Sequence, residues 1–258
     1  MSTPFSLVDS HCHIPLIEME GGASAIIEAA RQQGIEKMLC VSIDMDSYPA
    51  LLELAGQHNC ISASVGVHPN TAMAEEITVD QLIHHGSDPR VVAIGETGLD
   101  YFRSEGDLDW QRERFRRHIQ AARSVGKPLI IHCREAKEDV LRILKEERAD
   151  EVGGVMHCFV EDMDTALRSI DLDFAISFSG IVTFKSATAL QQVARQLPES
   201  SLLIETDSPY LAPVPYRGKQ NQPAYVRHVA EYLAQLRETT LEHIAAVTTT
   251  NYYNLFKH

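Results

Sequence analysis

Eight short apolar segments alternate with segments of helical periodicity along the chain, and this alternation constrains the fold more than any other feature. Nearly continuous apolar strands separated by helices are typical of a parallel sheet with both faces covered. Eight such units in 258 residues predict a (β/α)8 TIM barrel of the α/β class, with an open doubly wound sheet as the alternative. The apolar segments are Phe5–Asp9, Lys37–Ile43, Ile61–Gly66, Val91–Gly95, Pro128–His132, Gly153–His157, Phe174–Phe178 and Leu202–Glu205.

The intervening segments carry apolar residues at helical spacing, and helix-ending glycines support the assignment. Gly34 and Gly126 follow two of the predicted helices, as left-handed helix ends often do. We find no repeat or change in composition, so we predict a single domain over residues 1–258, with 208–223 as a long functional loop. The predicted helices are Ala23–Gln33, Tyr48–His58, Leu108–Val125, Lys137–Arg148, Met163–Ile170, Ala187–Gln196, Ala224–Arg237 and Leu241–Phe256.

The composition is that of a folded protein without a broad basic surface. Apolar residues make up 44% and charged residues 23%, and the formal net charge is −13. This charge excludes nucleic-acid binding through general basicity, so a polyanionic substrate would need local cations or metal ions. No apolar run suits a membrane span and Met1–Asp9 lacks a signal-peptide pattern, so we predict a cytoplasmic protein. The five cysteines are odd in number and contain no C-x-x-C pair, which favours reduced thiols.

Histidine, glutamate and aspartate side chains gather where the predicted strands end. In a barrel these ends converge on one face, where active sites are built. Because side chains alternate along a strand, His11 and His13 project to the same side. We therefore expect one inward-facing cluster of four imidazoles and two carboxylates. Its members are His11 and His13 after the first strand, Glu96 after the fourth, His132 and His157 at the ends of the fifth and sixth, and Asp207 after the eighth.

This combination of side chains predicts a metal centre. Buried imidazoles and carboxylates without partners are costly, and divalent cations compensate for such donors. Any one of these histidines alone would more often be a hydrogen-bonded core residue. Six protein ligands exceed the three or four that one catalytic zinc ion takes, so two divalent ions roughly 3.5–4 Å apart are expected.

Motifs along the whole chain resemble those of the TatD family of metal-dependent hydrolases, and within it the bacterial YcfH-type branch. The matching stretches are LVDSHCH at 7–13, GVHP at 66–69, GETGLDY at 95–101, KPLIIHCREA at 127–136, GGVMHCF at 153–159, SFSGIVTFK at 177–185 and LLIETDSPYLAP at 202–213. The resemblance implies a TIM barrel, two divalent ions, phosphodiester hydrolysis and deoxyribonuclease activity. Pro15 departs from the family pattern, which often has an acidic residue there.

The resemblance also implies a division of the ligands between the two ions. His11, His13 and Asp207 would hold one ion, His132 and His157 the other, and Glu96 both. As a mechanism we expect the ions to activate a shared water while Asp207 accepts its proton, which makes Asp207 and Glu96 the catalytic residues. Glu205 precedes Asp207 by two residues, so its side chain should project to the same inward side of the strand. We predict that it contacts and positions a ligand histidine; a buried structural acid is the alternative.

Further residues on the same side are candidates for substrate contact. His68 follows the third strand, and Arg134, Lys185 and Arg217 are cations suited to phosphate, although each could equally be a solvated loop charge. Tyr101 is the predicted aromatic contact. It belongs to a set that could stack on nucleobases but that more often simply packs in barrels: Tyr101, Phe102, Phe159, Phe184 and Tyr210.

Other conspicuous residues receive structural interpretations. Cys12, Cys133 and Cys158 adjoin predicted ligand histidines, and strand alternation turns their thiols away from the ions. The run 112–117 contains four arginines and is interpreted as the solvated face of an amphipathic helix. No chemistry is assigned to the remaining histidines in helical or terminal positions: His84, His85, His118, His228, His243 and His258.

Three kinds of function fit these features. The leading hypothesis is a phosphodiesterase acting on DNA ends, in the manner of a 3'-5' exonuclease; a small-molecule amide, lactone or phosphoester hydrolase is the alternative. A non-catalytic protein with structural metals is the third. Mixed imidazole and carboxylate ligands suit Zn²⁺, Mn²⁺, Fe²⁺ or Ni²⁺, and Mg²⁺ could still support activity in an assay. We expect no membrane partner and a monomer.

Overall fold

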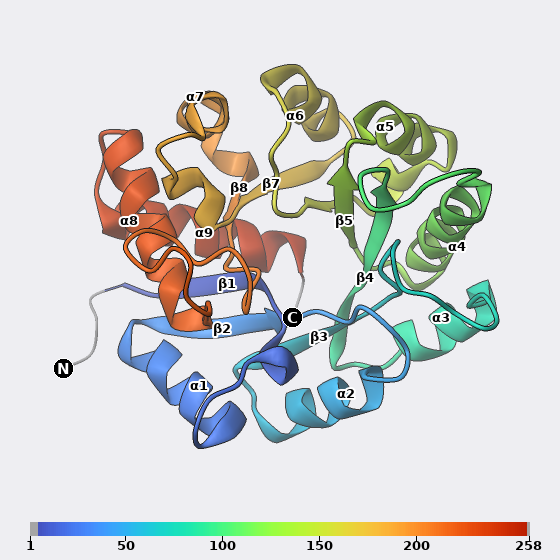
Figure 1. Cartoon of the computed structure of the whole chain (residues 1–258), viewed down its shortest axis with the longest axis horizontal. Helices are drawn as coiled ribbons and strands as arrows, with labels where there is room; N and C mark the ends of the chain where they lie inside the picture. The colour runs from blue at the N-terminus through green and yellow to red at the C-terminus, as the bar shows by residue number, and fades with distance from the viewer. Residues whose placement is uncertain (1–4, 257–258) are drawn as a thin grey trace. The chain divides into compact units, whose positions relative to one another are not determined.

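The computed structural model describes residues 5–256 and contains one eight-stranded sheet (Figure 1). Within these residues the strands follow one another in the sheet in the order β1 to β8, and every pairing with a described register is parallel. A helix follows each strand along the chain. This is the topology of a (β/α)8 TIM barrel, so the predicted fold class is confirmed. The predictions for residues 1–4 and His258 lie outside the described residues.

The elements have the following bounds. The strands are β1 Leu7–Cys12, β2 Ile35–Cys40, β3 Ile61–Val65, β4 Val91–Asp100, β5 Leu129–Arg134, β6 Gly154–Met156, β7 Phe174–Phe178 and β8 Leu202–Ile204. The helices are α1 Gly22–Gln32, α2 Tyr48–Gln57, α3 Val79–Gly86, α4 Asp109–Val125, α5 Lys137–Glu146, α6 Met163–Ile170, α7 Thr188–Gln196, α8 Val226–Leu236 and α9 Leu241–Leu255.

The predicted strands and helices are all present, with two informative differences. Strand β4 continues five residues past the predicted end at Gly95, through the polar stretch to Asp100. Helix α3 was not predicted, although its start carries a capping box in which Thr78 and Gln81 exchange hydrogen bonds with each other's backbone N–H groups. Helix α3 was missed because its eight residues span only about two turns, and the end of β4 was missed because it carries polar residues.

The chain divides into two compact units, which we describe separately. The first unit comprises the chain up to Cys40, Cys158–Met163 and Ile176–Asn254, and the second comprises Val41–His157, Asp164–Ala175 and the chain from Leu255. The prediction of a single domain over residues 1–258 stays a prediction.

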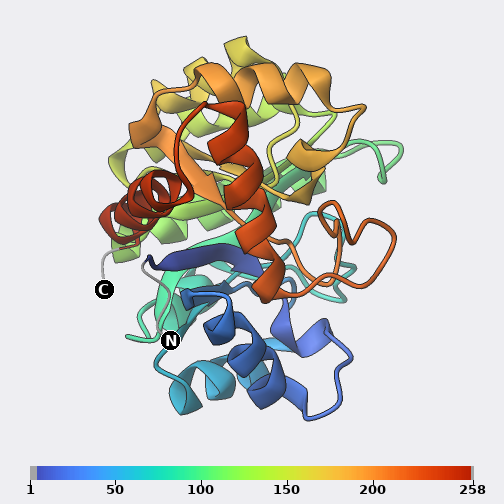
Figure 2. The ribbon, with the colours of Figure 1, turned by 90° about the vertical axis from the view of Figure 1, so that its left-hand side faces the viewer.

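In the first unit, β8 and β1 meet at the chain segments that carry predicted ligands. Strand β1 pairs with β2, β7 pairs with β8, and Cys12 of β1 forms a bridge with Ser208 just beyond β8. Helix α9 contacts the amino-terminal ends of β1 and β8: Thr249 Oγ1 donates to Ser6 O, and Asn251 Nδ2 donates to Leu202 O. Figure 2 shows α8 and α9 in red beside the blue strand β1.

The second unit contains β3 to β6 in sequence order, and helices α3 and α4 pack against β4 and against each other. A small apolar core between them includes Val67, Leu82 and Ala121, all fully buried. The chain just after β3 passes very close to β4, since a Cβ on Gly66 would lie 2.6 Å from the Gly95 backbone. No helix within residues 5–256 combines the length and apolar character that crossing a membrane requires.

The close approach at Gly66 leads to a stability prediction. Gly66→Ala should lower the free energy of unfolding by about 1–3 kcal/mol, because backbone atoms cannot move aside as a side chain could. Gly56→Ala is the control: it lies in helix α2, where a Cβ meets only the flexible end of Arg90. Urea denaturation of both variants measures the difference, and a Gly66→Ala protein as stable as Gly56→Ala would contradict the prediction.

Candidate metal centre

Three predicted ligands come together in the first unit. His11 Nε2 lies 3.2 Å from His13 Nε2, and Asp207 Oδ1 lies 3.7 Å from the former and 3.5 Å from the latter. The two histidines are almost fully buried. We call these residues the β1–β8 cluster; it presents two imidazole nitrogens and a carboxylate oxygen to one point.

Backbone hydrogen bonds hold the β1–β8 cluster in place. Asp207 N–H donates to His11 O at 2.9 Å, and His13 N–H donates to Ser208 O at 2.8 Å, so the end of β1 is tied to the chain beyond β8. Asp207 has a φ of 55°, a left-handed conformation that Asp tolerates better than most residues. This turn directs its side chain back toward the two histidines.

A buried carboxylate that sequence analysis did not single out supports this turn. Asp9 is fully buried and accepts hydrogen bonds from both N–H and Oγ–H of Thr206, at 2.8 and 2.6 Å. Burial raises the pKa of Asp9 well above its ordinary value, although the Thr206 hydrogen bonds oppose it. Asp9 therefore fixes the residue immediately before Asp207. Asp9 precedes His11 by two residues on the same strand, and this spacing could have identified it from the sequence.

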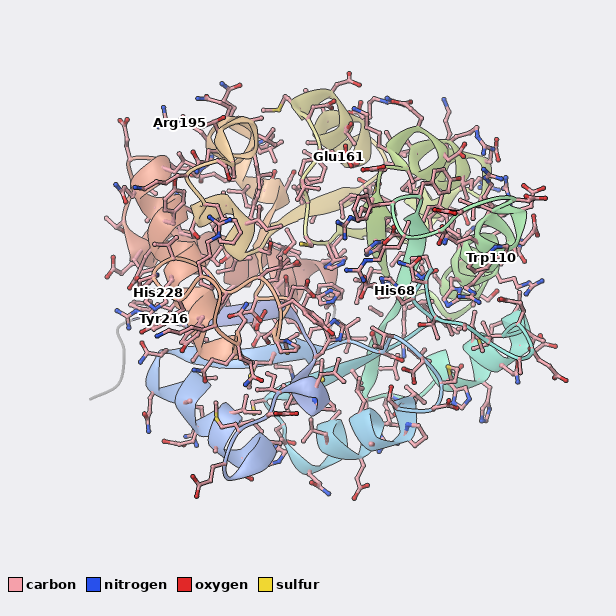
Figure 3. The ribbon with its side chains drawn as sticks, in the orientation of Figure 1. His68, Trp110, Glu161, Arg195, Tyr216 and His228 are labelled. Carbon is pink, nitrogen blue, oxygen red and sulfur yellow. The ribbon has the colours of Figure 1, made fainter. Side chains whose placement is uncertain are left out.

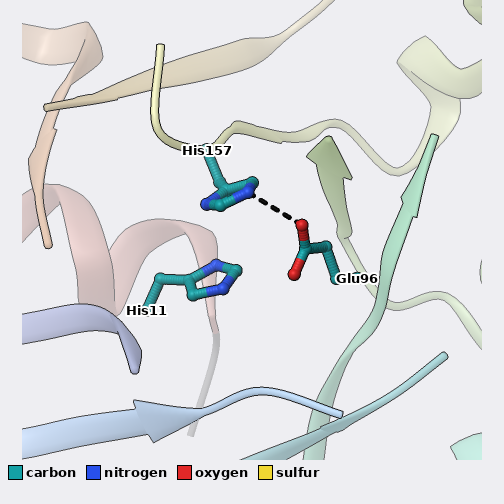
Figure 4. Close-up of side chains that lie close together, drawn as sticks. All are labelled: His11, Glu96 and His157. Atoms are coloured by element: carbon teal, nitrogen blue, oxygen red, sulfur yellow. Dashed lines mark ion pairs between the residues drawn. The ribbon is translucent and has the colours of Figure 1, made fainter. Parts of the chain in front are cut away.

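The second unit brings together the other predicted ligands. His132 Nδ1 and His157 Nε2 each lie 2.9 Å from Glu96 Oε1, and His68 Nε2 lies 3.5 Å from the same oxygen. Figure 4 draws the ion pair between His157 and Glu96 as a dashed line. We call these four residues the Glu96 cluster. His68 was predicted as a substrate contact, and the structure places it beside Glu96.

Two serines position the strand segment that carries Glu96. Ser64 Oγ–H donates to Gly95 O at 2.6 Å, and Glu96 N–H donates to Ser42 O at 2.9 Å. Ser42 N–H in turn donates to Ser64 Oγ. The buried backbone around Glu96 is thereby hydrogen-bonded although β4 is irregular there, with its register to β5 shifting between Ile94 and Thr97.

Asp100 is a functional candidate that the sequence analysis missed. Its Oδ2 lies 3.1 Å from His132 Nε2 and accepts a hydrogen bond from Asn70 Nδ2 at 2.8 Å. Burial acts to raise the pKa of Asp100, but hydrogen bonds with His132, Arg103 N–H and Asn70 outweigh it and hold the pKa well below its usual range. Asp100 lies four residues after Glu96 on the same strand, so alternation puts both side chains on the same side. This spacing could have identified Asp100 from the sequence.

The Asp100 contact determines how His132 is oriented. An ionised carboxylate at Nε2 favours a proton on that nitrogen and leaves Nδ1, which faces Glu96, as the nitrogen able to bind a cation. Burial acts to lower the pKa of His132, but hydrogen bonds with Asp100 and Glu96 outweigh it and raise the pKa. A carboxylate behind a ligand histidine is the usual arrangement in metal sites.

His68 is held as a neutral donor. Asn70 N–H donates to His68 Nδ1 at 3.1 Å, which assigns the proton to Nε2, the nitrogen that faces Glu96. Burial lowers the pKa of His68 to about 4 despite the nearby Glu96 carboxylate. At neutral pH this side chain therefore presents an uncharged N–H group.

Helix α4 fixes the loop that carries His68, and this corrects the interpretation of the 112–117 arginine run. Arg114 is not solvated: it is only 2% exposed, forms a two-bond ion pair with Glu76, and donates to the carbonyls of His68 and Thr71. His118, to which no chemistry was assigned, accepts Val67 N–H through Nε2 at 3.0 Å. Burial lowers the pKa of His118 to about 4, which keeps this acceptor unprotonated at neutral pH.

The other predicted substrate contacts have varied surroundings. The Tyr101 hydroxyl donates to Asp139 and accepts from Arg112 Nε, so only its ring is available to a substrate. Arg134 lies over the Phe102 ring at 4.0 Å, and Arg217 lies over the Phe184 ring at 4.3 Å. Arg217 and Lys185 are exposed.

Glu205 and the cysteines occupy structural positions. Glu205 is fully buried, and its Oε1 accepts Cys158 N–H at 2.7 Å, directly after His157 in the chain. It thereby fixes backbone next to a predicted ligand. Cys12 directs its thiol to Leu39 O, along the sheet. The five cysteines form no disulfide within residues 5–256, in line with the predicted thiols.

The donor sets fit divalent cations. In the β1–β8 cluster, one ligand atom from each of three residues lies within 4.8 Å of the others. In the Glu96 cluster, His132 Nδ1 and His157 Nε2 each lie 2.9 Å from Glu96 Oε1. Mixed imidazole and carboxylate donors suit Zn²⁺, Mn²⁺, Fe²⁺ or Ni²⁺. A cation would also offset the cost of burying carboxylates and imidazoles together.

The buried arginine of α4 leads to the next prediction. Arg114→Met should lower the free energy of unfolding by about 3 kcal/mol, because it leaves the carbonyls of His68 and Thr71 and the Glu76 carboxylate without their donor. Arg117→Met is the matched control, since Arg117 contacts the same Glu76 at 3.8 Å from a half-buried position on the same helix and should cost less than about 1 kcal/mol. Guanidinium denaturation tests both; equal losses would show that Arg114 acts only as a surface charge.

The chain is similar in sequence to metal-dependent hydrolases. The sequence profile described as TatD related DNase matches residues 8–257. The chain is 45% identical over 253 residues to the uncharacterized metal-dependent hydrolase YcfH of Escherichia coli K12, covering 97% of this chain and 95% of that protein. It is 42% identical to the uncharacterized metal-dependent hydrolase YabD of Bacillus subtilis, covering 97% and 99%.

Solved structures share the fold over the same length. The crystal structure of YJJV, a TatD homolog from Escherichia coli K12, has a TM-score of 0.92 and 27% sequence identity, covering 98% of both chains. A TatD family hydrolase from Entamoeba histolytica has a TM-score of 0.87 at 20% identity, a likeness of fold alone. The chain therefore belongs to the TatD family of metal-dependent hydrolases.

Proposed function

We propose that this hydrolase is a phosphodiesterase that acts on DNA, in the manner of a 3'-5' exonuclease. The observation that carries the proposal is the presence of two imidazole–carboxylate clusters: one at the end of β1 and just beyond β8, the other within β4 and β5 and just beyond β3 and β6. The family description supports the choice of DNA. We also propose that the protein works in the cytoplasm as a monomer.

The proposed ligands are divided between two ions. His11, His13 and Asp207 would hold one, His132 and His157 the other, with Glu96 contacting both. The carboxyl-terminal side of the strands is where TIM barrels build their active sites, which supports a catalytic role for these ligands. When bound, such ions activate a water and neutralise charge that develops on phosphoryl oxygens.

The protein's own groups have distinct proposed roles in the reaction. Asp207 accepts the proton of the attacking water. His68 donates its Nε2–H to a phosphoryl oxygen, a role that suits a neutral imidazole whose Nδ1 is held by Asn70 N–H. Asp100 orients His132, while Glu205 holds the backbone next to His157.

Substrate contacts are assigned to cations and one aromatic ring around these clusters. Arg134, Lys185 and Arg217 would bind phosphates, with the arginines able to form two-bond contacts. Tyr101 would contribute its ring. Local cations of this kind are needed because the chain as a whole carries a net charge of −13.

The same net charge favours a second candidate, hydrolysis of a small amide, lactone or phosphoester. Such a substrate would not require many phosphate contacts. Salt separates the two possibilities: the kcat/KM for DNA should fall steeply between 50 and 200 mM salt, whereas turnover of a small neutral substrate should change little.

Metal content and substrate class are tested together. Purified protein should contain about two divalent ions per chain, lose hydrolysis of end-labelled single-stranded DNA on chelation, and regain it when Mn²⁺ or Zn²⁺ is restored. Glu96→Ala should abolish hydrolysis and reduce the metal content. Glu113→Ala, an exposed change on α4, is the control. A Glu96→Ala protein with undiminished hydrolysis would exclude the proposed centre, and turnover of small esters but not DNA would favour the second candidate.

The role of Asp207 as proton acceptor is tested by a change of one atom. Asp207→Asn should lower kcat by about 10²–10⁴-fold, since an amide cannot accept the proton of the water. Asp173→Asn is a matched control, because Asp173 also has a left-handed backbone, with a φ of 63°, on an exposed turn. Single-turnover kinetics at saturating metal, with melting temperatures to verify folding, provide the measurement. Unchanged kcat in Asp207→Asn would assign the proton to another group.

A further inference from the structure

An exposed aromatic ring lies two residues beyond the end of β4. Phe102 is 56% exposed, the highest value among the large hydrophobic side chains exposed within residues 5–256. Covering a phenylalanine ring with a partner removes apolar area from water and is favourable, so an exposed ring can contribute to binding. Phe102 follows Asp100 by two residues, and Asp100 contacts the predicted ligand His132.

The chain around Phe102 is held firmly although its ring is exposed. Asp100 Oδ1 accepts the N–H groups of Phe102 and Arg103, at 3.1 and 2.8 Å. Tyr101 N–H donates to Arg134 O, and the Tyr101 hydroxyl is bound to Asp139 on helix α5. The ring is thus presented by a fixed turn, which lowers the entropy cost of binding a flat partner.

A cation covers one face of the ring. The guanidinium carbon of Arg134 lies 4.0 Å from the centre of the Phe102 ring. Stacking in this way uses the face of the guanidinium group and leaves its in-plane N–H groups able to donate. Arg134 follows His132 by two residues on β5, so both side chains leave the same side of the strand.

We propose that Phe102 and Arg134 form a nucleobase subsite. The base of a nucleotide next to the scissile phosphodiester stacks on Phe102, and Arg134 donates to a phosphate of the same strand. A flat π-system next to an anion is the chemistry that an aromatic ring paired with a fixed guanidinium recognises, as in other single-strand binders. This inference rests on the proposed function and names the substrate as single-stranded nucleic acid.

The test compares oligonucleotides that differ by a single base. Wild-type protein should cleave a single-stranded oligonucleotide with about 5- to 150-fold higher kcat/KM than the same oligonucleotide with an abasic residue at one of its last positions, because stacking contributes about 1–3 kcal/mol per base. Phe102→Leu should reduce this ratio to less than about two, because it should slow cleavage only of the oligonucleotide that has the base. Phe102→Trp should preserve the ratio, whereas Arg134→Gln should slow both substrates.

Trp110→Leu is the matched control. Trp110 is also an exposed aromatic residue of the second unit, 41% exposed, with the Arg114 guanidinium 5.0 Å from its ring, but it lies on helix α4 (Figure 3). Its replacement should leave the ratio unchanged. Equal slowing of both oligonucleotides by Phe102→Leu, or no slowing of either, would overturn the subsite, as would a Trp110→Leu variant that loses the discrimination.

A binding measurement separates failure of the subsite from failure of the proposed function. Metal-free wild-type protein should bind a fluorescein-labelled oligothymidylate more tightly than its abasic counterpart, and Phe102→Leu should lose that difference in fluorescence anisotropy. If wild-type protein cleaves no nucleic acid yet shows this difference, the nuclease proposal fails and the subsite stands. If it hydrolyses bis(p-nitrophenyl) phosphate and DNA without discriminating abasic residues, the subsite fails and the phosphodiesterase proposal stands.

Discussion

The second unit depends on the burial of one ionised carboxylate, that of Asp100. Its two oxygens accept hydrogen bonds from Asn70 and from two successive backbone N–H groups, and one of them also faces His132. Its own N–H donates to Gln111 on helix α4. A buried carboxylate without such partners would be very unfavourable, so these groups are held where Asp100 requires them. One side chain therefore sets the orientation of a predicted ligand, the loop after β3 and the turn that carries Phe102.

Much of the fold and part of the site could be predicted because they depend on periodicity. Alternating apolar strands and helices specify a (β/α)8 barrel, and the two-residue spacing of His11 and His13 places both on one side of β1. The structure brings these two together with Asp207, and Glu96 together with His132 and His157. Helix α3 was missed because its eight residues span only about two turns, and its capping box indicates where a helix starts but not how long it is.

The supporting residues of helix α4 could not be predicted, because their roles depend on contacts between distant segments. Arg114, His118 and Ala121 repeat at helical spacing on α4, next to the apolar stripe of Phe115 and Ile119, and all five are buried. From the sequence alone, Arg114 and His118 would be expected on the solvent-exposed face of the helix. They are buried because the loop after β3 covers them and offers its carbonyls to Arg114. Nothing local to α4 specifies that loop, so composition and periodicity could not distinguish Arg114 from its neighbours.

The acidic net charge and the proposed anionic substrate are compatible because charge acts locally. Exposed surface charges are screened within about 8–10 Å at physiological salt, so acidic side chains far from a bound phosphate contribute little to its binding. What matters there is how the nearby cations are held. Arg134 and Arg217 each lie over a phenylalanine ring, and a guanidinium group stacked in this way loses less freedom when it binds a phosphate than a lysine on a free stem would. An acidic protein can thus bind a phosphodiester with few cations, provided that aromatic rings orient them before the substrate arrives.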